Sequence, residues 1–361
     1  MSRRAAIVGV LVAAGVVAAV LAIVLPRDDT PEAVGSARAV ALDVGPDGRA
    51  YALLERTDSG IRRAAVSRAG DDGELDPQPV DLPIDDASAL AVAAGDSLVV
   101  AGTRLVDGTR RVAVGRIGPD GRPDPSFGAN GLVTVQAGDG DAIARGIATS
   151  PAGSSAVVVA DASRDERHAL ALVHIDIGTG RSSVDLIDDA AAGGVAAAGD
   201  DTFLVAGSDT RNGDVVLARL SAQGEPQVTR ARTDLRGASW RAVAPTPDGG
   251  AVVVGSGRAA DLRSLVAFVR VTSALEEADR GALPVGDGDG FGQAVQTDRG
   301  GRVLIVANGA HDDSPAAYLV ALAGERKPQR KAAGRAAGLT PDGGLLTTRW
   351  DGERQSVAFN P

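Results

Sequence analysis

The sequence predicts an all-β protein, a β-propeller of seven four-stranded blades that follows one N-terminal transmembrane helix. One observation is a repeated phrase: a short alternating strand, a tight turn and an apolar strand ending in Gly or Ala recur about every fifty residues. A second is that scarcely any stretch keeps the helical period over three turns. The third is composition, because 47 Gly and 2% aromatic residues suit sheets that pack closely through small side chains.

The N-terminus predicts a membrane anchor. Arg3 and Arg4 precede an uncharged apolar run over residues 5–25, and Pro26 ends it. As a helix this run would span about 30 Å, the thickness of a bilayer core. Positive charges stay cytoplasmic, so residues 1–4 form a cytoplasmic stub and the rest of the chain is extracytoplasmic, as in a single-pass protein of the cell membrane. A cleavable signal peptide is the alternative, although its apolar core is usually shorter.

Residues 37–361 are predicted to form one propeller domain, because the repeated phrase continues to the end of the chain. Six blades is the alternative count, if the degenerate copy at Gly193–Gly207 is not a true repeat. The seven copies open with the segments Ala39–Gly48, Leu90–Asp96, Ile147–Gly153, Val195–Asp200, Val243–Gly249, Ala294–Gly300 and Gly338–Gly343.

The clearest unit lies between Ser88 and Gly140 and contains four candidate strands. Four antiparallel strands per unit is the pattern of a propeller blade. A single turn of helix is plausible only at Thr272–Arg280. The four strands are expected at Leu90–Ala94, Leu98–Gly102, Arg111–Ile117 and Leu132–Val135.

The last unit offers only three strands, at Ala336–Leu339, Leu345–Arg349 and Gln355–Phe359. A fourth must come from elsewhere if the ring is to close without exposed sheet edges. Residues 26–36 form the linker after the anchor, and residues 30–36 are placed to supply that closing strand.

One segment of the second unit carries a family resemblance. Arg116–Val133 reads RIGPDGRPDPSFGANGLV. It resembles the delta-60 repeat of bacterial propeller-type envelope proteins, and the acidic link Gly138–Ala142 that follows is similar to the one between such repeats. The resemblance implies a propeller in the cell envelope; because the repeat is a structural module, the resemblance does not point to any particular activity. Physically the segment needs no ligand, because Asp124 and Ser126 can bond nearby amides and Phe127 can pack onto the blade.

Composition excludes several functions. The formal net charge is -10, so a nucleic-acid partner, which needs a basic face, is not expected. The chain has no Cys, and therefore no disulfide, thiolate metal site or Cys nucleophile. No nucleophile elbow and no cofactor fingerprint in its required context occur. We expect no cofactor beyond a bound cation, for which Ca²⁺ is the candidate.

Acidic residues recur where one blade passes to the next. Converging carboxylates there could bind Ca²⁺, which takes six to eight oxygen ligands. The alternative is that these Asp residues cap turns and accept hydrogen bonds from the amides of entering strands. The candidate metal ligands are Asp86, Asp139, Asp141, Asp189, Asp287 and Asp289.

Two functions follow. The first is a membrane-anchored extracytoplasmic propeller that acts as a binding or scaffold module for a protein or glycan of the cell envelope; the mixed charges of the hairpins that precede each third strand could recognise such a partner. The alternative is a cation-dependent hydrolase or lyase with its site at the channel mouth. No catalytic residue is assigned, because His311, Asp312 and Ser314 lie in one loop rather than converging from several.

Overall fold

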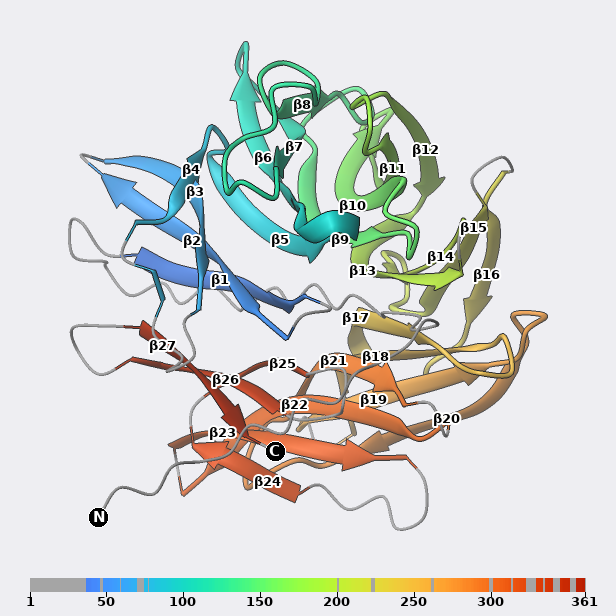
Figure 1. Cartoon of the computed structure of the whole chain (residues 1–361). Helices are drawn as coiled ribbons and strands as arrows, with labels where there is room; N and C mark the ends of the chain where they lie inside the picture. Colours follow the sequence, from blue (N-terminus) through green and yellow to red (C-terminus); the bar gives the residue numbers. More distant parts are fainter. Residues whose placement is uncertain are drawn as a thin grey trace, which may run out of the picture.

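A computed structural model describes residues 37–361 except 46–47, 59, 70–74, 77, 200, 222–224, 261–262, 299–300, 313, 323–328, 334, 340–344, 351–354 and 361 (Figure 1). The predicted stub (1–4), anchor (5–25) and linker with its closing strand (26–36) lie outside the described residues. Within the described part of the chain, no helix has the length and apolarity needed to cross a membrane.

The described chain is all-β, as predicted, and folds into consecutive antiparallel sheets. Sheet 1 comprises β1 (Ala37–Val44), β2 (Ala50–Asp58), β3 (Ile61–Arg68) and β4 (Val80–Leu82). Sheet 2 comprises β5 (Asp86–Val92), β6 (Leu98–Val106), β7 (Thr109–Ile117) and β8 (Leu132–Val135), with a short 3₁₀ turn, η1 (Ala94–Asp96), between β5 and β6. Sheet 3 comprises β9 (Ile143–Thr149), β10 (Ser155–Arg164), β11 (Arg167–Asp176) and β12 (Ser182–Asp188).

The second half repeats the pattern. Sheet 4 comprises β13 (Ala190–Gly199), β14 (Thr202–Asp209), β15 (Val215–Ser221) and β16 (Gln227–Ala231). Sheet 5 comprises β17 (Arg236–Pro245), β18 (Ala251–Arg258), β19 (Ser264–Val271) and β20 (Glu277–Leu283). Sheet 6 comprises β21 (Phe291–Thr297), β22 (Val303–His311), β23 (Ser314–Ala321) and β24 (Gln329–Ala333). Sheet 7 has three strands in the described residues, β25 (Arg335–Leu339), β26 (Leu345–Trp350) and β27 (Gln355–Asn360).

The sheets stand around a common centre (Figure 1). The first strand of each sheet contacts the first strand of the next, and β25 of sheet 7 contacts β1 of sheet 1. In an antiparallel sheet, the turn between strands two and three and the link to the next sheet lie at the same end. We call that side of the ring the hairpin face.

The core lies between consecutive sheets. One cluster joins sheets 1 and 2, and others fill the spaces between the following pairs as far as sheets 5 and 6. Ala and Val dominate these clusters, with single large residues such as Trp240 and Phe268. The sheets therefore pack closely through small side chains, which the low aromatic content of the sequence predicts.

Every first strand carries a β-bulge at the same place, because its pairing with the second strand skips one residue. Opposite the bulge the second strand often has glycine: a Cβ on Gly102, Gly207 or Gly255 would lie 2.1–2.5 Å from a first-strand carbonyl oxygen. This close approach explains why the apolar strand of the repeat ends in Gly or Ala. The bulged residues are Val40, Ser88, Arg145, Gly193, Arg241, Gln293 and Ala337.

The four predicted strands of the second unit and the three within the last unit form, with ends that shift by up to four residues. The degenerate copy at Gly193–Gly207 is a genuine unit, since it supplies β13 and β14 of sheet 4. The prediction of a helical turn at Thr272–Arg280 is wrong. The chain turns there, with Leu275 at φ 62°, and enters β20, because strand pairing with β19 outweighs a weak local helical pattern.

The delta-60-like segment forms a compact loop between β7 and β8. Asp124 accepts hydrogen bonds from the amide (2.9 Å) and hydroxyl (2.7 Å) of Ser126, and Phe127 is fully buried. Hydrogen bonds from Ser126, with the nearby charge of Arg116, lower the pKa of Asp124. Gly128 has φ 55°, and a Cβ there would lie 2.4 Å from the Leu132 carbonyl oxygen. The structural role predicted for these residues is confirmed.

Candidate functional site

The aspartates of the links hold the hairpins of the ring. The amides of Asp85, Asp139 and Asp287 each donate to a second-strand carbonyl of the following sheet at 3.0 Å. Their carboxylates then accept the amide two residues further along, from Leu105 (2.7 Å), Asp165 (2.6 Å) and Asp312 (3.1 Å) respectively. Three links thus share one arrangement, which clamps each link to the hairpin of the sheet that it enters.

A second aspartate ties two of these links to the preceding sheet. Asp141 accepts the amide of Arg110 at 2.8 Å, and Asp289 accepts the amide of Ser264 at 2.8 Å; both donors lie within the first two residues of a third strand. The sequence Gly-Asp-Gly-Asp at 138–141 and 286–289 therefore connects two neighbouring sheets. The carboxylate of its first Asp accepts a hydrogen bond from the following sheet, and that of its second Asp accepts one from the preceding sheet. The first glycine fits closely in both copies, because a Cβ on Gly138 or Gly286 would lie 2.0–2.1 Å from a carbonyl oxygen.

The six predicted metal ligands are not brought together. Asp86 faces Arg62 (3.5 Å), and Asp189 binds Arg167 (2.7 Å) and Arg211 (3.5 Å). The other four, Asp139, Asp141, Asp287 and Asp289, accept the backbone amides described above. Across the described residues, no group of three or more His, Asp or Glu side chains is arranged to hold a metal ion. A Ca²⁺ site at these residues stays a prediction, and the contacts present favour the capping role.

We expect Asp139→Ala and Asp287→Ala each to lower the free energy of unfolding by about 1–2 kcal/mol, because each leaves a hairpin amide without its acceptor. Urea denaturation of the full chain measures this, with the exposed Glu225→Gln as the control expected to stay within about 0.5 kcal/mol. The loss should be the same in Ca²⁺ and in chelator. A midpoint that rises with Ca²⁺ in the parent chain, but not in the variants, would instead assign these carboxylates to an ion.

A network of charges covers the hairpin face of sheets 3 and 4. Asp209, whose side chain is 1% exposed, accepts Arg211 through both oxygens (3.0 and 2.6 Å) and Arg230 at 3.0 Å. Hydrogen bonds from Arg211 lower the pKa of Asp209 to about 2. Asp189 links Arg211 to Arg167. These guanidinium groups are held at the surface in fixed positions, although they remain largely exposed.

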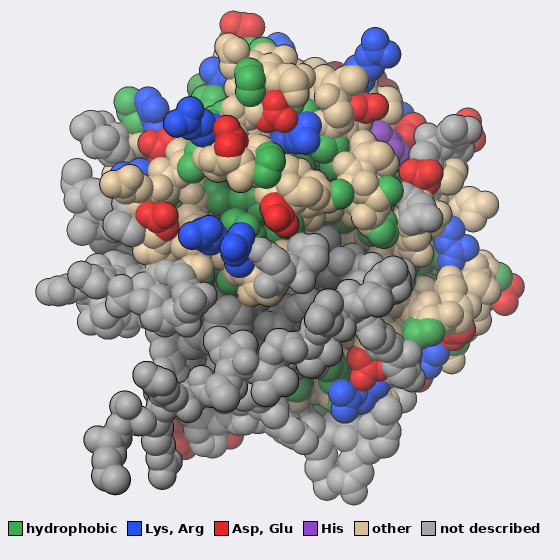
Figure 2. All heavy atoms as spheres, in the orientation of Figure 1, with side chains coloured by type: hydrophobic (Ala, Val, Ile, Leu, Met, Phe, Trp, Pro, Cys, Tyr) green, Lys and Arg blue, Asp and Glu red, His purple; other side chains and the backbone are tan. Residues whose placement is uncertain are grey.

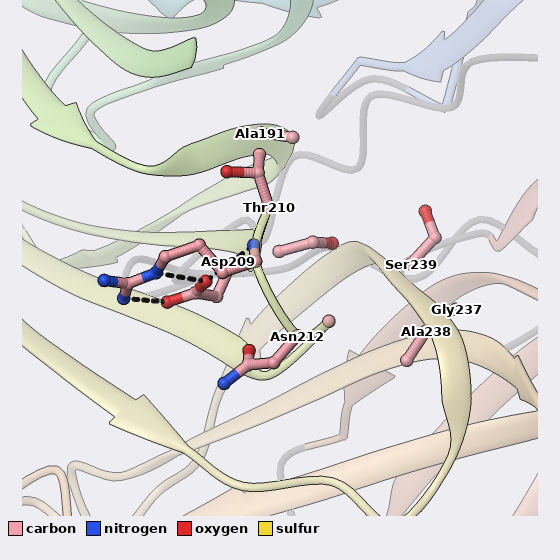
Figure 3. A pocket seen from close by; sticks show the side chains of 10 residues that line it. Ala191, Asp209, Thr210, Asn212, Gly237, Ala238 and Ser239 are labelled. Carbon is pink, nitrogen blue, oxygen red and sulfur yellow. Dashed lines mark hydrogen bonds and ion pairs between the residues drawn. The ribbon is translucent and has the colours of Figure 1, made fainter. Parts of the chain in front are cut away.

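Beside this network lies a pocket of about 450 Å³. The hairpin from Ser208 to Gly213 forms one wall, and Gly237–Ser239 of β17 form the other, with Ala191 of β13 between them (Figure 3). Figure 3 shows the carboxylate of Asp209 paired with the guanidinium next to it. Trp240 holds the end of the hairpin wall, because its indole nitrogen donates a hydrogen bond to the Gly213 carbonyl at 3.0 Å.

The first strands are joined to the preceding sheets by second-strand side chains. Thr103, Asp161 and Ser208 accept the amides of Ala144 (3.2 Å), Ala192 (2.7 Å) and Trp240 (2.9 Å), each of which precedes a bulged residue. One acceptor is a carboxylate, and Arg145 neutralises it through a 2.6 Å ion pair with Asp161.

Asp43, near the end of β1, is a partly buried acid whose enclosing contacts sequence reasoning missed. Its two oxygens accept the amides of Val44 and Val92, both at 2.8 Å, and no cation is paired with it among the described residues. Burial raises the pKa of Asp43 to about 7, against the opposing effect of these two hydrogen bonds. An aspartate in an alternating strand gives no sign in the sequence of such enclosure.

The remaining sequence motifs stay separate. His311 and Ser314 are backbone register partners, the last pair of the β22–β23 hairpin. His174 lies 3.5 Å from Asp185, and its partial burial lowers the pKa of His174 against the opposing charge of Asp185. On the side of the molecule seen in Figure 2, acidic and basic side chains are interspersed.

Comparisons with known proteins support the fold. The β-propeller domain of the Trilobed protease from Pyrococcus furiosus matches at TM-score 0.52 and 9% identity, covering 90% of this chain and 94% of that one. Acylaminoacyl peptidase from Pyrococcus horikoshii (TM-score 0.52, 12% identity) and prolyl oligopeptidase B from Galerina marginata (0.51, 11%) match over 90% of this chain. The chain spans 52% of each of these two peptidases.

At such identity the likeness shows the β-propeller fold alone. No family model matches the chain, and no curated protein does.

Proposed function

We propose that this protein is a membrane-anchored, extracytoplasmic β-propeller that binds a protein or glycan of the cell envelope on its hairpin face. The observation that carries the proposal is the pocket between sheets 4 and 5, whose wall includes Arg211 held by Asp209. Fixed polar groups around a concave site favour binding, because little conformational freedom is lost when a ligand docks.

Hydrogen bonds and ion pairs also hold the hairpin face outside the pocket. Its links are clamped by Asp85, Asp139 and Asp287. Its exposed arginines, among them Arg167 and Arg211, are oriented by ion pairs. Exposed ion pairs add little stability, so their regular placement is better explained by presentation of charge to a partner.

The remaining parts of the proposal rest on the sequence. We propose seven blades, since the first strands contact one another in a closed cycle that includes sheet 7. Residues 30–36 complete the last blade, and residues 5–25 anchor the chain with its propeller outside the cytoplasm. The delta-60 resemblance of Arg116–Val133 supports an envelope setting. The hydrolase or lyase alternative needs the link aspartates to bind a cation. Their carboxylates instead accept hydrogen bonds from backbone amides, which favours a structural role.

The pocket variant Ser239→Trp tests the binding function. Ser239 is exposed on the pocket wall, so an indole there should fill the pocket without changing any charge. We expect the full chain, in detergent, to bind one class of envelope glycan or protein on an array of purified components. The variant should lose about tenfold or more of that affinity, which corresponds to about 1.4 kcal/mol.

Ala274→Trp is the matched control. Ala274 is exposed in the turn between β19 and β20, in the same sheet but on the opposite side of the ring, and should leave binding unchanged. Equal binding by both variants would move the site away from this pocket. Failure of the parent chain to bind any envelope component, or release of a cleaved product from one, would overturn the binding function.

A further inference from the structure

Two arginines stand opposite each other near the tip of the β6–β7 hairpin in sheet 2. Arg104 of β6 is the register partner of Arg111 of β7, so both side chains lie on the same face of the sheet, with Cβ atoms about 5 Å apart. Each of the two residues is partly buried. Like charges directly opposite each other destabilise a sheet, so the stability of the hairpin does not explain this pair.

The pair lies on the face of sheet 2 that packs against sheet 1. Val100 and Ala113, on the same side of their strands, belong to the apolar cluster between these two sheets. A Cβ on Gly102, the next residue of β6 on that side, would lie 2.4 Å from the side chain of Ile84. The two arginines therefore lie where this apolar layer ends, at the hairpin face.

The pair has no counter-charge in the described part of the chain. Neither guanidinium forms a hydrogen bond or an ion pair with a described residue, and the Nε of Arg111 is buried without an acceptor. The acids of this corner have other contacts. Asp85 accepts a backbone amide of the same hairpin at 2.7 Å, and Arg62 lies 3.6 Å from Glu55 and 3.5 Å from Asp86. A buried donor without an acceptor is costly, and a bound anion would supply the acceptor.

Sheet 4 shows which group fits this position. Thr103 and Ser208 are equivalent residues, because each accepts the amide that precedes the next bulge. The residues that follow them, Arg104 and Asp209, therefore occupy the same place in their sheets. In sheet 4 the carboxylate of Asp209 is held there by two guanidinium groups. In sheet 2 two guanidinium groups are present, and no described residue supplies the carboxylate.

We infer that Arg104 and Arg111 form an anion site on the hairpin face, which takes a carboxylate group of a ligand. Guanidinium groups offer paired donors that match the two oxygens of a carboxylate. The site belongs to sheets 1 and 2, whereas the pocket lies between sheets 4 and 5. It is thus a second binding place on this face, and it does not depend on whether the pocket binds an envelope component.

Calorimetric titration of the full chain in detergent tests the site at a fixed low ionic strength, where screening is weak. The probes are succinate, a free dicarboxylate, and poly-L-glutamate, which carries the same group on a peptide. We expect at least one of them to bind, and the preferred probe identifies the source of the carboxylate. Arg104→Gln and Arg111→Gln should each weaken that binding about tenfold or more, because a charge-assisted hydrogen bond is lost. Arg104→Lys should retain part of it, since the charge remains without the planar fork.

Three controls separate this site from the pocket and from a structural role. Arg258→Gln removes the same charge from an exposed position at the hairpin of sheet 5 and should leave carboxylate binding unchanged. Ser239→Trp, which fills the pocket, should leave it unchanged as well. Without a ligand, Arg104→Gln and Arg111→Gln should melt at the same temperature as the parent chain or higher, because like charges no longer face each other.

Three results would each overturn the inference. The first is that the parent chain binds neither probe, whatever the pocket binds. The second is an equal loss of binding in Arg258→Gln, which would show that only the overall charge matters. The third is a lower melting temperature of both glutamine variants, which would reveal that the two arginines have a structural partner within the chain.

Discussion

Gly193→Ala is expected to destabilise this protein by about 3 kcal/mol or more, or to prevent its folding. A Cβ at residue 193 would lie 2.1 Å from the Trp240 carbonyl oxygen and 2.7 Å from that of Ala206. Both obstacles are backbone atoms of packed strands, so neither can move aside as a flexible side chain would. The change would force β13 away from β17, and with it sheet 4 from sheet 5. Urea denaturation of the purified chain measures the effect.

Gly199→Ala is the matched control in the same strand. Its Cβ would meet nothing closer than 4.0 Å, so we expect a change within about 0.5 kcal/mol. If Gly193→Ala is recovered only as insoluble protein while Gly199→Ala folds, the contrast still supports the close approach. A Gly193→Ala chain as stable as the parent would show that β13 and β17 do not pack at this distance.

The second large effect is a dependence of stability on pH that Asp43 produces. Its pKa of about 7 in the folded protein is above the ordinary value of 3.8 that the unfolded chain is expected to have. The folded state therefore keeps a proton that the unfolded state releases. The stabilisation is complete below about pH 4 and is lost as the pH rises to about 7, in total at most about 4 kcal/mol, since solvent reaches part of the residue.

Asp43→Asn removes this titration, so the test is a comparison of slopes. Between pH 4 and pH 7 the parent chain should lose up to about 1.4 kcal/mol per pH unit relative to the variant. Absolute stabilities are less informative, because an Asn can accept only one of the amides of Val44 and Val92 through its carbonyl. Parallel pH profiles for the two chains would contradict an enclosed, protonated Asp43. Glu225→Gln should keep the slope of the parent.

Much of the fold could be predicted because local signals repeat. The strand Leu132–Val135 was predicted with the bounds it has, and Leu345–Arg349 falls one residue short of β26. Apolar alternation and Gly-rich turns are sufficient for such strands. The helical turn predicted at Thr272–Arg280 does not form, because its local helical pattern is weak and strand pairing with β19 outweighs it.

The candidate site was less predictable because its contacts join residues far apart in sequence. The sequence shows that Asp139 and Asp287 recur at equivalent places. Whether their carboxylates converge on a cation or accept backbone amides depends on distant residues, here the amides of Asp165 and Asp312. The pocket beside Asp209 was also missed, since its walls come from β14, the hairpin after it and β17. A signal was present in the repeated Gly-Asp-Gly-Asp, which suggests two equivalent bridges once the repeat is known.

The sequence by itself determined that this chain is a ring of small-residue β-sheets, because strand periodicity, turn residues and repeat spacing are local properties. Only the tertiary structure decided the state of individual charges. Arg145 and Arg241 look alike in the sequence, yet Asp161 neutralises the first, whereas Ser256 stands in the corresponding place for the second. Bulges set those registers, and enclosure sets the pKa of Asp43. Both depend on which backbone lies alongside, a relation between sheets that no single strand encodes.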